Sequence, residues 1–230
     1  MYQAAVTDYK SPKILAGTVI TFLVLSMLSS LGSAFVVVTN GSEALALPQD
    51  INSFTASQLT LNATTFGEKL LFVIAGLFFI IWLCRLWHNL ASFRLNGFET
   101  RLWHCIWSFF IPIWNLFKPL IVVEEIWQAS SPATTSPTQW QFLPKSKLIS
   151  CWWWLYVGGS FIDMFVRFAR KGMTVTTLHG HGHMMYFYFA SWAASFASMV
   201  ACIMLVRALT AMQDQKHEKL MRKAQEEQPA

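Results

Sequence analysis

The chain has 230 residues, of which 54% are hydrophobic and only 13% are charged, and its mean hydropathy is +0.41. Ordinary soluble domains carry roughly 25% charged residues, so this composition excludes an average globular domain and indicates an integral membrane protein. The net charge is +5. Because the cations stand in small groups beside apolar runs and form no basic stripe, we expect no nucleic acid partner.

The first apolar run, at about residues 14–38, is long enough to cross a bilayer, which takes roughly 20 residues. It is longer than the apolar core of a signal peptide, which favours a permanent span. Within it, small residues recur four positions apart, a spacing typical of close helix packing in lipid. These residues are Ser26, Ser29, Ser30 and Ser33.

After a polar loop, we predict a second span at about residues 70–90, followed by an apolar segment at 103–127 that two prolines interrupt. At about 100° per residue, one helical face of this segment gathers aromatic residues and the opposite face gathers small or polar ones. The aromatic face holds Trp103, Trp107, Phe110, Trp114 and Phe117, and the opposite face holds Ser108, Pro112, Asn115 and Pro119. We therefore expect a lipid-facing aromatic side and a polar, kinked side.

The positions of lysine and arginine decide whether residues 103–127 cross the membrane. If all five apolar runs cross and the N-terminus is inside, 8 of the 17 cations lie inside, which is no bias. If this segment instead re-enters or lies in the interface, the only cations outside are Lys69, Arg167, Arg170 and Lys171. Since cytoplasmic loops carry an excess of lysine and arginine, we predict four crossings, with both termini in the cytoplasm.

The third predicted span, about 148–168, begins with three tryptophans typical of a membrane interface and contains Gly158 and Gly159 for close packing. Asp163 and Arg167 are four residues apart, so we expect an interfacial ion pair rather than an ion path. The last span, about 184–210, has a broad face of alanine and serine for packing against a neighbour.

The predicted fold is thus all-α: an integral membrane helical bundle of four transmembrane helices plus one proline-broken re-entrant or interfacial segment at 103–127. We expect a single transmembrane domain at 1–212 and a charged cytoplasmic tail at 213–230. Zinc-protease, nucleophile-elbow, P-loop and dinucleotide motifs do not occur in the sequence, and we expect no enzyme.

Two groups of histidines are candidate ligands. In an extended stretch His179, His181 and His183 share one side, so they could bind one Cu, Ni or Zn ion; the alternative is a flexible polar turn. His88 and His104 fall near the same predicted inner surface. They are either ligands of a haem or chlorophyll-like pigment or a pair of interfacial histidines.

Polar residues and prolines recur at fixed spacing through the centre of the chain: Trp82-x-x-Arg85-x-x-x-Asn89, then Pro112-x-x-Asn115-x-x-x-Pro119, then Glu125-Ile126-Trp127. This pattern resembles a bacterial membrane family known only as domain of unknown function four-three-two-eight, over about residues 70–130. Leu120 stands where that family commonly has a tyrosine. The resemblance implies a helical fold, a bacterial inner membrane location and a set of marked positions, but no reaction.

In the four-crossing arrangement the polar members of this pattern lie near the inner face. We predict that Arg85 pairs with Glu124 or Glu125, and that Asn89 and Asn115 satisfy the backbone groups that the prolines leave free.

The sequence therefore predicts a non-catalytic integral membrane protein, an accessory or scaffold subunit that contacts lipids and either another membrane protein or further copies of itself. One alternative is a channel or carrier that uses the broken segment 103–127. The other is a metal-handling membrane protein that uses the loop at His179–His183.

Overall fold

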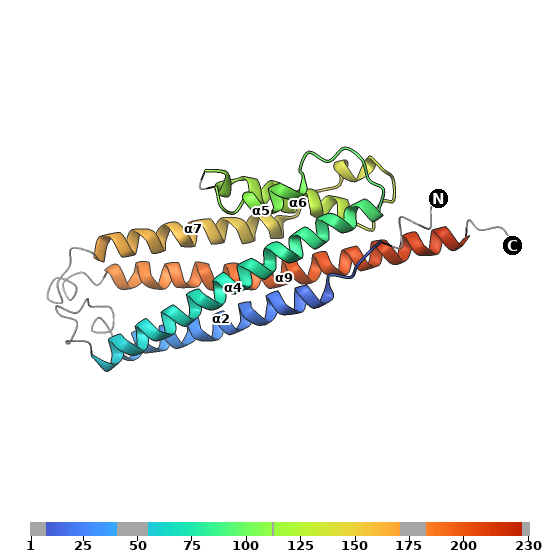
Figure 1. Cartoon of the computed structure of the whole chain (residues 1–230). Helices are drawn as coiled ribbons and strands as arrows, with labels where there is room; N and C mark the ends of the chain where they lie inside the picture. Colours follow the sequence, from blue (N-terminus) through green and yellow to red (C-terminus); the bar gives the residue numbers. More distant parts are fainter. Residues whose placement is uncertain (1–7, 41–54, 112, 171–182, 227–230) are drawn as a thin grey trace. The chain divides into compact units, whose positions relative to one another are not determined.

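The computed structural model describes residues 8–40, 55–111, 113–170 and 183–226, and every regular element in these ranges is helical (Figure 1). The predicted all-α fold is confirmed. The long helices are α2 (Lys13–Asn40), α4 (Ala56–Ser92), α7 (Lys147–Arg170) and α9 (His183–Glu226). Between α4 and α7 the chain forms α5 (Leu102–Trp107), η1 (Trp114–Leu116), α6 (Lys118–Ser130) and η2 (Gln139–Phe142).

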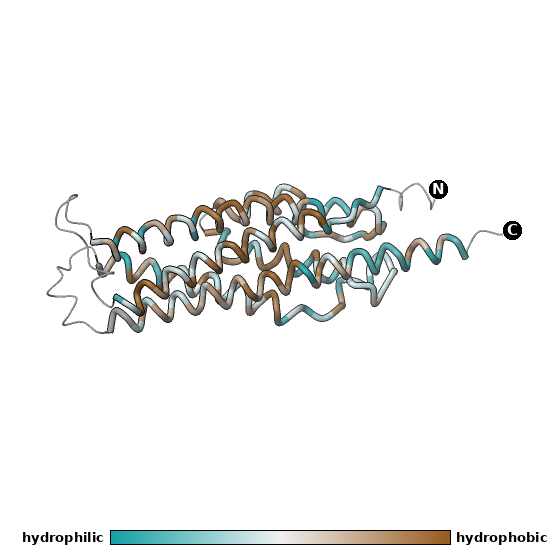
Figure 2. Tube along the Cα trace, turned by 90° about the horizontal axis from the view of Figure 1, so that it is seen from below, coloured by the Kyte–Doolittle hydropathy of each residue, from teal (hydrophilic) through white to brown (hydrophobic). Residues whose placement is uncertain are grey.

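Three helices in the described part of the chain are long and apolar enough to cross a membrane: α2, α4 and, within α9, Tyr186–Glu226. Figure 2 shows hydrophobic residues along the middle of the long helices and mainly hydrophilic ones near the C-terminus. Four such helices were expected. The predicted span at 148–168 does form a helix, α7, but its tryptophans, with their polar indole N–H groups, and the charges of Asp163 and Arg167 make it less apolar.

The chain forms two compact units, and each long helix contributes to both. The first unit comprises Met1–Ile20, Gly76–Ser150 and Cys202–Ala230, and the second comprises Thr21–Ala75 and Cys151–Ala201. Within the first unit the buried core contains Trp82, Leu86 and Leu90 of α4, and this unit also holds all of α5 and α6.

In the second unit, serine hydroxyl groups join α2 to α4. Ser29 Oγ donates to the Thr64 carbonyl at 2.8 Å, and Ser33 Oγ donates to Thr64 Oγ1 at 2.9 Å. Ser26 Oγ donates to the carbonyl of Glu68 at 3.1 Å. The small residues that the sequence spaced four apart therefore do form a helix contact, as predicted, and they add interhelical hydrogen bonds to it.

The same unit packs α7 against α9 through Gly159. An added Cβ there would lie 3.2 Å from Ala194 Cβ and 3.3 Å from Ser195 Oγ, whereas at Gly158 it would meet nothing within 4 Å. Ser191 Oγ of α9 donates to the Gly159 carbonyl at 3.3 Å. Only the second of the two glycines thus provides the close approach that the sequence suggested.

The predicted ion pair of Asp163 and Arg167 is confirmed, with Arg167 Nε 2.9 Å from Asp163 Oδ2. Lys69 Nζ of α4 lies 3.7 Å from the same carboxylate oxygen. Lys69 and Arg167, two of the four cations predicted to lie on the outer side of the membrane, therefore both pair with Asp163.

The apolar segment at 103–127 does not form one helix. Helix α5 ends at Trp107, turns follow, and α6 begins at Lys118. Pro119 lies in the first turn of α6, where its missing N–H has no intrahelical partner to lose. Pro119 therefore starts a helix where we expected it to interrupt one, and Pro112 lies outside the described residues.

We predict that Gly159→Val destabilises the protein by about 1–3 kcal/mol, because overpacking moves the neighbours of a tight helix contact. Thermal unfolding in detergent, followed by tryptophan fluorescence, measures this change. Gly158→Val is the matched control, since its added side chain meets open space, and it is expected to unfold close to the unmodified chain. Equal shifts in both variants would contradict the packing role of Gly159.

Candidate functional site

Asn89, in the last turns of α4, is 2% exposed and uses all its side-chain hydrogen-bonding atoms. Its Oδ1 accepts the backbone N–H of Lys10 at 3.2 Å, and its Nδ2 donates to the Lys10 carbonyl at 2.9 Å. The same Nδ2 donates to Gln213 Oε1 of α9, also at 2.9 Å. Asn89 therefore joins the N-terminal segment, α4 and α9, and its side chain does not satisfy a backbone group freed by a proline.

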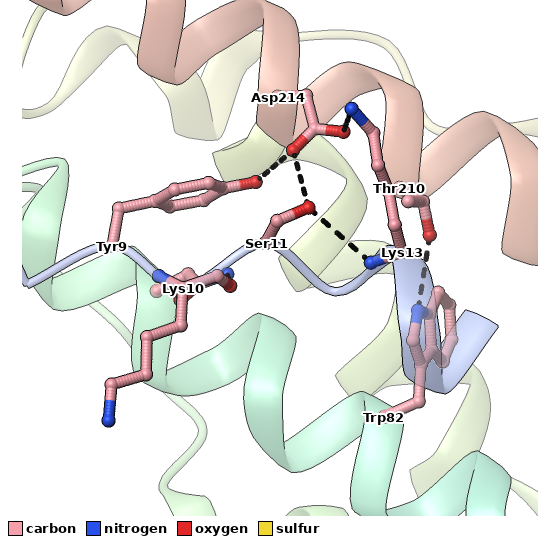
Figure 3. Close-up of polar contacts among 8 residues, drawn as sticks. Tyr9, Lys10, Ser11, Lys13, Trp82, Thr210 and Asp214 are labelled. Carbon is pink, nitrogen blue, oxygen red and sulfur yellow. Dashed lines mark hydrogen bonds and ion pairs between the residues drawn. The ribbon is translucent and has the colours of Figure 1, made fainter. Parts of the chain in front are cut away.

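Gln213 is fully buried and completes this connection. Its Nε2 donates to the Leu86 carbonyl of α4 and to Ser130 Oγ at the end of α6, both at 3.0 Å. One turn earlier on α9, Thr210 Oγ1 accepts the indole N–H of Trp82 at 3.2 Å (Figure 3). Two of the three marked residues of α4, Trp82 and Asn89, thus bind α9, a role that the sequence pattern did not predict.

The N-terminal segment before α2 binds α9 through Asp214 (Figure 3). Tyr9 Oη and Ser11 Oγ donate to Asp214 Oδ1 at 2.6 and 3.2 Å, and Lys13 Nζ lies 3.3 Å from Oδ2. Burial, the hydrogen bond to Asp214 and the negative charge of that carboxylate all raise the pKa of Tyr9. The tyrosine hydroxyl therefore remains a donor to Asp214 at physiological pH.

Lys216 is fully buried, although the sequence placed it in a charged tail. Its Nζ donates to the Ala129 carbonyl at 2.7 Å, near the C-terminal end of α6, where helix carbonyls lack partners and the helix dipole is negative. The ammonium also lies 5.5 Å from the centre of the Phe93 ring. Farther along α9, Lys219 Nζ donates to the Pro132 carbonyl at 3.0 Å.

Helix α9 thus continues past the predicted start of the tail and packs within the first unit. At 44 residues it is about 66 Å long, more than twice the roughly 30 Å of a bilayer core. Its apolar run ends at Met212, so Gln213 and Lys216 lie beyond the membrane part. The sequence missed both residues because a lysine-rich helix end normally faces water.

The predicted pairing of Arg85 with Glu124 or Glu125 is wrong. Glu125 accepts the backbone N–H groups of Glu99 and Thr100 at 2.7 and 3.0 Å, just before α5. Glu124 pairs with Lys145 at 2.8 Å. Because both carboxylates find partners in the loops on either side of α5 and α6, neither needs an arginine from α4.

Arg85 and His88 instead line a cavity of about 640 Å³ at the end of α4, together with Lys10. His104 is held elsewhere: its Nδ1 accepts the Arg101 N–H at 2.8 Å, and its ring stacks on Trp103 with centres 4.0 Å apart. No contact between His88 and His104 occurs in the described structure.

His179 and His181 lie outside the described residues, as does the side chain of His183. Within the described ranges no group of three or more His, Cys, Asp or Glu side chains could hold a metal.

The broken segment presents the two sides that the sequence predicted, although it is not one helix. The five aromatic residues assigned to its lipid side, Trp103, Trp107, Phe110, Trp114 and Phe117, are all exposed, while Ser108 and Pro119 are buried. The Asn115 Oδ1 atom is buried and has no hydrogen-bond partner among the described residues, and Trp127 is half-buried in α6. Exposed aromatic rings on a short, broken element suit contact with lipid or with another protein.

In the residues that the structure describes, these features define an all-helical protein with helices long and apolar enough to span a membrane. A polar network joins its N-terminal segment, α4, α6 and α9. The chain belongs to the family described as Domain of unknown function (DUF4328), whose model matches residues 48–211. This match confirms the resemblance noted in the sequence and extends it to most of the chain. No curated protein and no solved structure matches the chain significantly.

We predict that Gln213→Ala destabilises the protein by about 1–3 kcal/mol for each buried partner left unpaired, namely Asn89 and Ser130. Thermal or chaotrope unfolding in detergent measures the loss. Gln215→Ala is the matched control, because Gln215 is exposed two positions later on the same helix and should change stability by less than about 0.5 kcal/mol. A Gln213 variant as stable as the control would contradict this role.

Lys216 should make stability depend on alkaline pH. Burial, and secondarily the charge of Lys219, lowers the pKa of Lys216 to about 8 from 10.5. Between these values the unfolded chain binds more protons than the folded one, so this residue's contribution to stability rises with pH from about 8 to 10.5.

The unfolding midpoint of the unmodified protein should therefore increase relative to that of Lys216→Met as the pH is raised from about 7 to 10. The exposed Lys223→Met variant is the control and should follow the unmodified protein across this range. A constant difference between the unmodified protein and Lys216→Met would show that Lys216 does not titrate abnormally.

Proposed function

We propose that the protein is a non-catalytic integral membrane protein that works as an accessory or scaffold subunit of a membrane complex. The observation that carries the proposal is the exposed apolar surface of the broken segment between α4 and α6. Trp107, Phe110 and Phe117 are 53%, 57% and 55% exposed, and Ile113 is 77% exposed. We call residues 103–117 the aromatic surface.

The aromatic surface differs from an ordinary lipid-facing helix. A span presents apolar side chains from a continuous helix whose backbone groups are satisfied internally. Here α5 has six residues and η1 has three, so the surface is built on turns and short helices. Tryptophan and phenylalanine are enriched at protein interfaces, and Trp is a frequent hot-spot residue, which supports a protein partner over lipid alone.

The proposal includes a topology. We place the aromatic surface in a re-entrant or interfacial position and α7 across the membrane, with both termini on the cytoplasmic side of a bacterial inner membrane. In the second unit α7 contacts α4 and α9, which are apolar enough to span, and it has 24 residues. Its length and its packing beside two apolar helices support a fourth crossing.

A channel or carrier is the second candidate function. A cavity of about 270 Å³ in the second unit is lined by Glu68, Lys69, Asp163 and Arg167, among other residues. Charged side chains within or next to membrane spans are costly and often mark substrate or ion pathways. However, three of these four charges already form ion pairs with one another, so a purely structural role explains them as well. Metal handling by His179–His183 also stays a prediction.

The accessory-subunit proposal predicts that a photoreactive amino acid at position 107 or 110 crosslinks the protein, in its own membranes, to a protein of different mass. Mass spectrometry of the adduct would identify the partner. The matched control is the same amino acid at Phe35, which is 69% exposed on α2, where we expect lipid adducts alone. Lipid adducts alone at all three positions would overturn the proposal, and adducts of twice the chain mass would replace the accessory subunit by a homo-oligomeric scaffold.

A further inference from the structure

The cavity at the end of α4 is lined by the cations Lys10 and Arg85, which form no ion pair with a carboxylate in the described part of the chain. Arg85 and His88 lie three residues apart on α4, on one helical face, and both line the cavity of about 640 Å³. Within the described residues Arg85 forms no ion pair. The two glutamates predicted to pair with it have other partners: Glu124 binds Lys145, and Glu125 binds backbone N–H groups. An arginine left unpaired in a cavity of ligand size is available to an anion.

Lys10 is held at this cavity by its backbone. Asn89, one turn after Arg85, bonds both the N–H and the carbonyl of Lys10, at 3.2 and 2.9 Å. The position of residue 10 is therefore fixed on α4 independently of its side chain. The Lys10 side chain is exposed and lines the same cavity as Arg85 and His88. Figure 3 shows the Lys10 side chain extending away from the contacts of Tyr9 and Ser11 with Asp214.

We propose that Lys10, Arg85 and His88 bind the phosphodiester of an anionic phospholipid in this cavity. Arginine and lysine next to the end of a span are well placed to contact headgroup phosphates, and basic pockets on the cytoplasmic side of membrane proteins bind anionic lipids. Arg85 lies near the end of the apolar part of α4. Ile81, one turn earlier, and Cys84, the residue before Arg85, give the cavity an apolar side for the lipid's glycerol and acyl groups.

The charge of the cavity favours a phosphodiester over free phosphate. Asp8 also lines it, so apart from His88 the charged side chains are two cations and one carboxylate. Their sum of about +1 matches the single negative charge of a phosphodiester, whereas free phosphate carries close to two at neutral pH. This inference concerns a lipid ligand of the first unit and does not depend on the partner proposed for the aromatic surface.

The test is native mass spectrometry of the full chain in detergent with added short-chain phosphatidylglycerol. One phosphatidylglycerol should bind per chain, in preference to phosphatidylcholine, and excess inorganic phosphate should not displace it. Arg85→Gln should weaken this binding about fivefold, the loss expected for one basic residue beside an anionic lipid. Arg207→Gln is the matched control, because Arg207 is an exposed arginine of α9 that lines no part of this cavity, and its adduct should be unchanged.

Lys10→Gln is a second variant that keeps the backbone contacts with Asn89, so it tests the site even if the arginine variant folds poorly. It should also weaken phosphatidylglycerol binding about fivefold. Equal binding by the Lys10 and Arg207 variants would overturn the proposal. Displacement of the lipid by inorganic phosphate would also overturn it and would identify a free-phosphate site.

Discussion

The polar contacts of the first unit depend on one buried pair of amides. Asn89 of α4 and Gln213 of α9 bond to each other. Asn89 also bonds Lys10, and Gln213 also bonds the Leu86 carbonyl of α4 and Ser130 at the end of α6. A buried amide without partners costs about 1–3 kcal/mol, so the four elements must meet in one register to satisfy both side chains. Apolar packing alone would allow the helices to slide into several registers, whereas the Asn89–Gln213 hydrogen bonds form in only one of them.

The buried lysine follows from the same geometry. Once Gln213 is set against Ser130, the next residue on that face of α9, three positions on, is Lys216, which reaches the Ala129 carbonyl. The end of α6 thereby obtains a cation where its dipole is negative. Burying an ammonium is unfavourable by itself, which is why its pKa falls. The residue is tolerated because the end of α6 supplies both an acceptor and a favourable field.

Much of the fold could be predicted because long apolar runs in a sequence indicate membrane spans directly. The apolar runs of α2, α4 and α9, the serine spacing on α2 and the Asp163–Arg167 pair each follow from local sequence, and each is present. The partners of Glu124 and Glu125, and hence the lack of a described ion pair at Arg85, could not be predicted in this way. They depend on where the loops at 99–100 and 145 lie, and opposite charges in a sequence do not reveal which backbone N–H groups compete for a carboxylate.

The broken segment departs from the general rule that buried polar atoms form hydrogen bonds. The side-chain oxygen atoms of Ser108 and Asn115, and of Thr100 just before α5, are buried and have no hydrogen-bond partner among the described residues. Trp107, Phe110 and Phe117 of the same segment are exposed. Well-packed proteins leave few such atoms, because each costs about 1–3 kcal/mol. Lipid tails offer no hydrogen bonds and cannot satisfy them. The segment therefore combines exposed aromatic side chains with buried polar atoms that the described residues leave unpaired, which explains why neither a continuous helix nor a simple lipid-facing surface forms there.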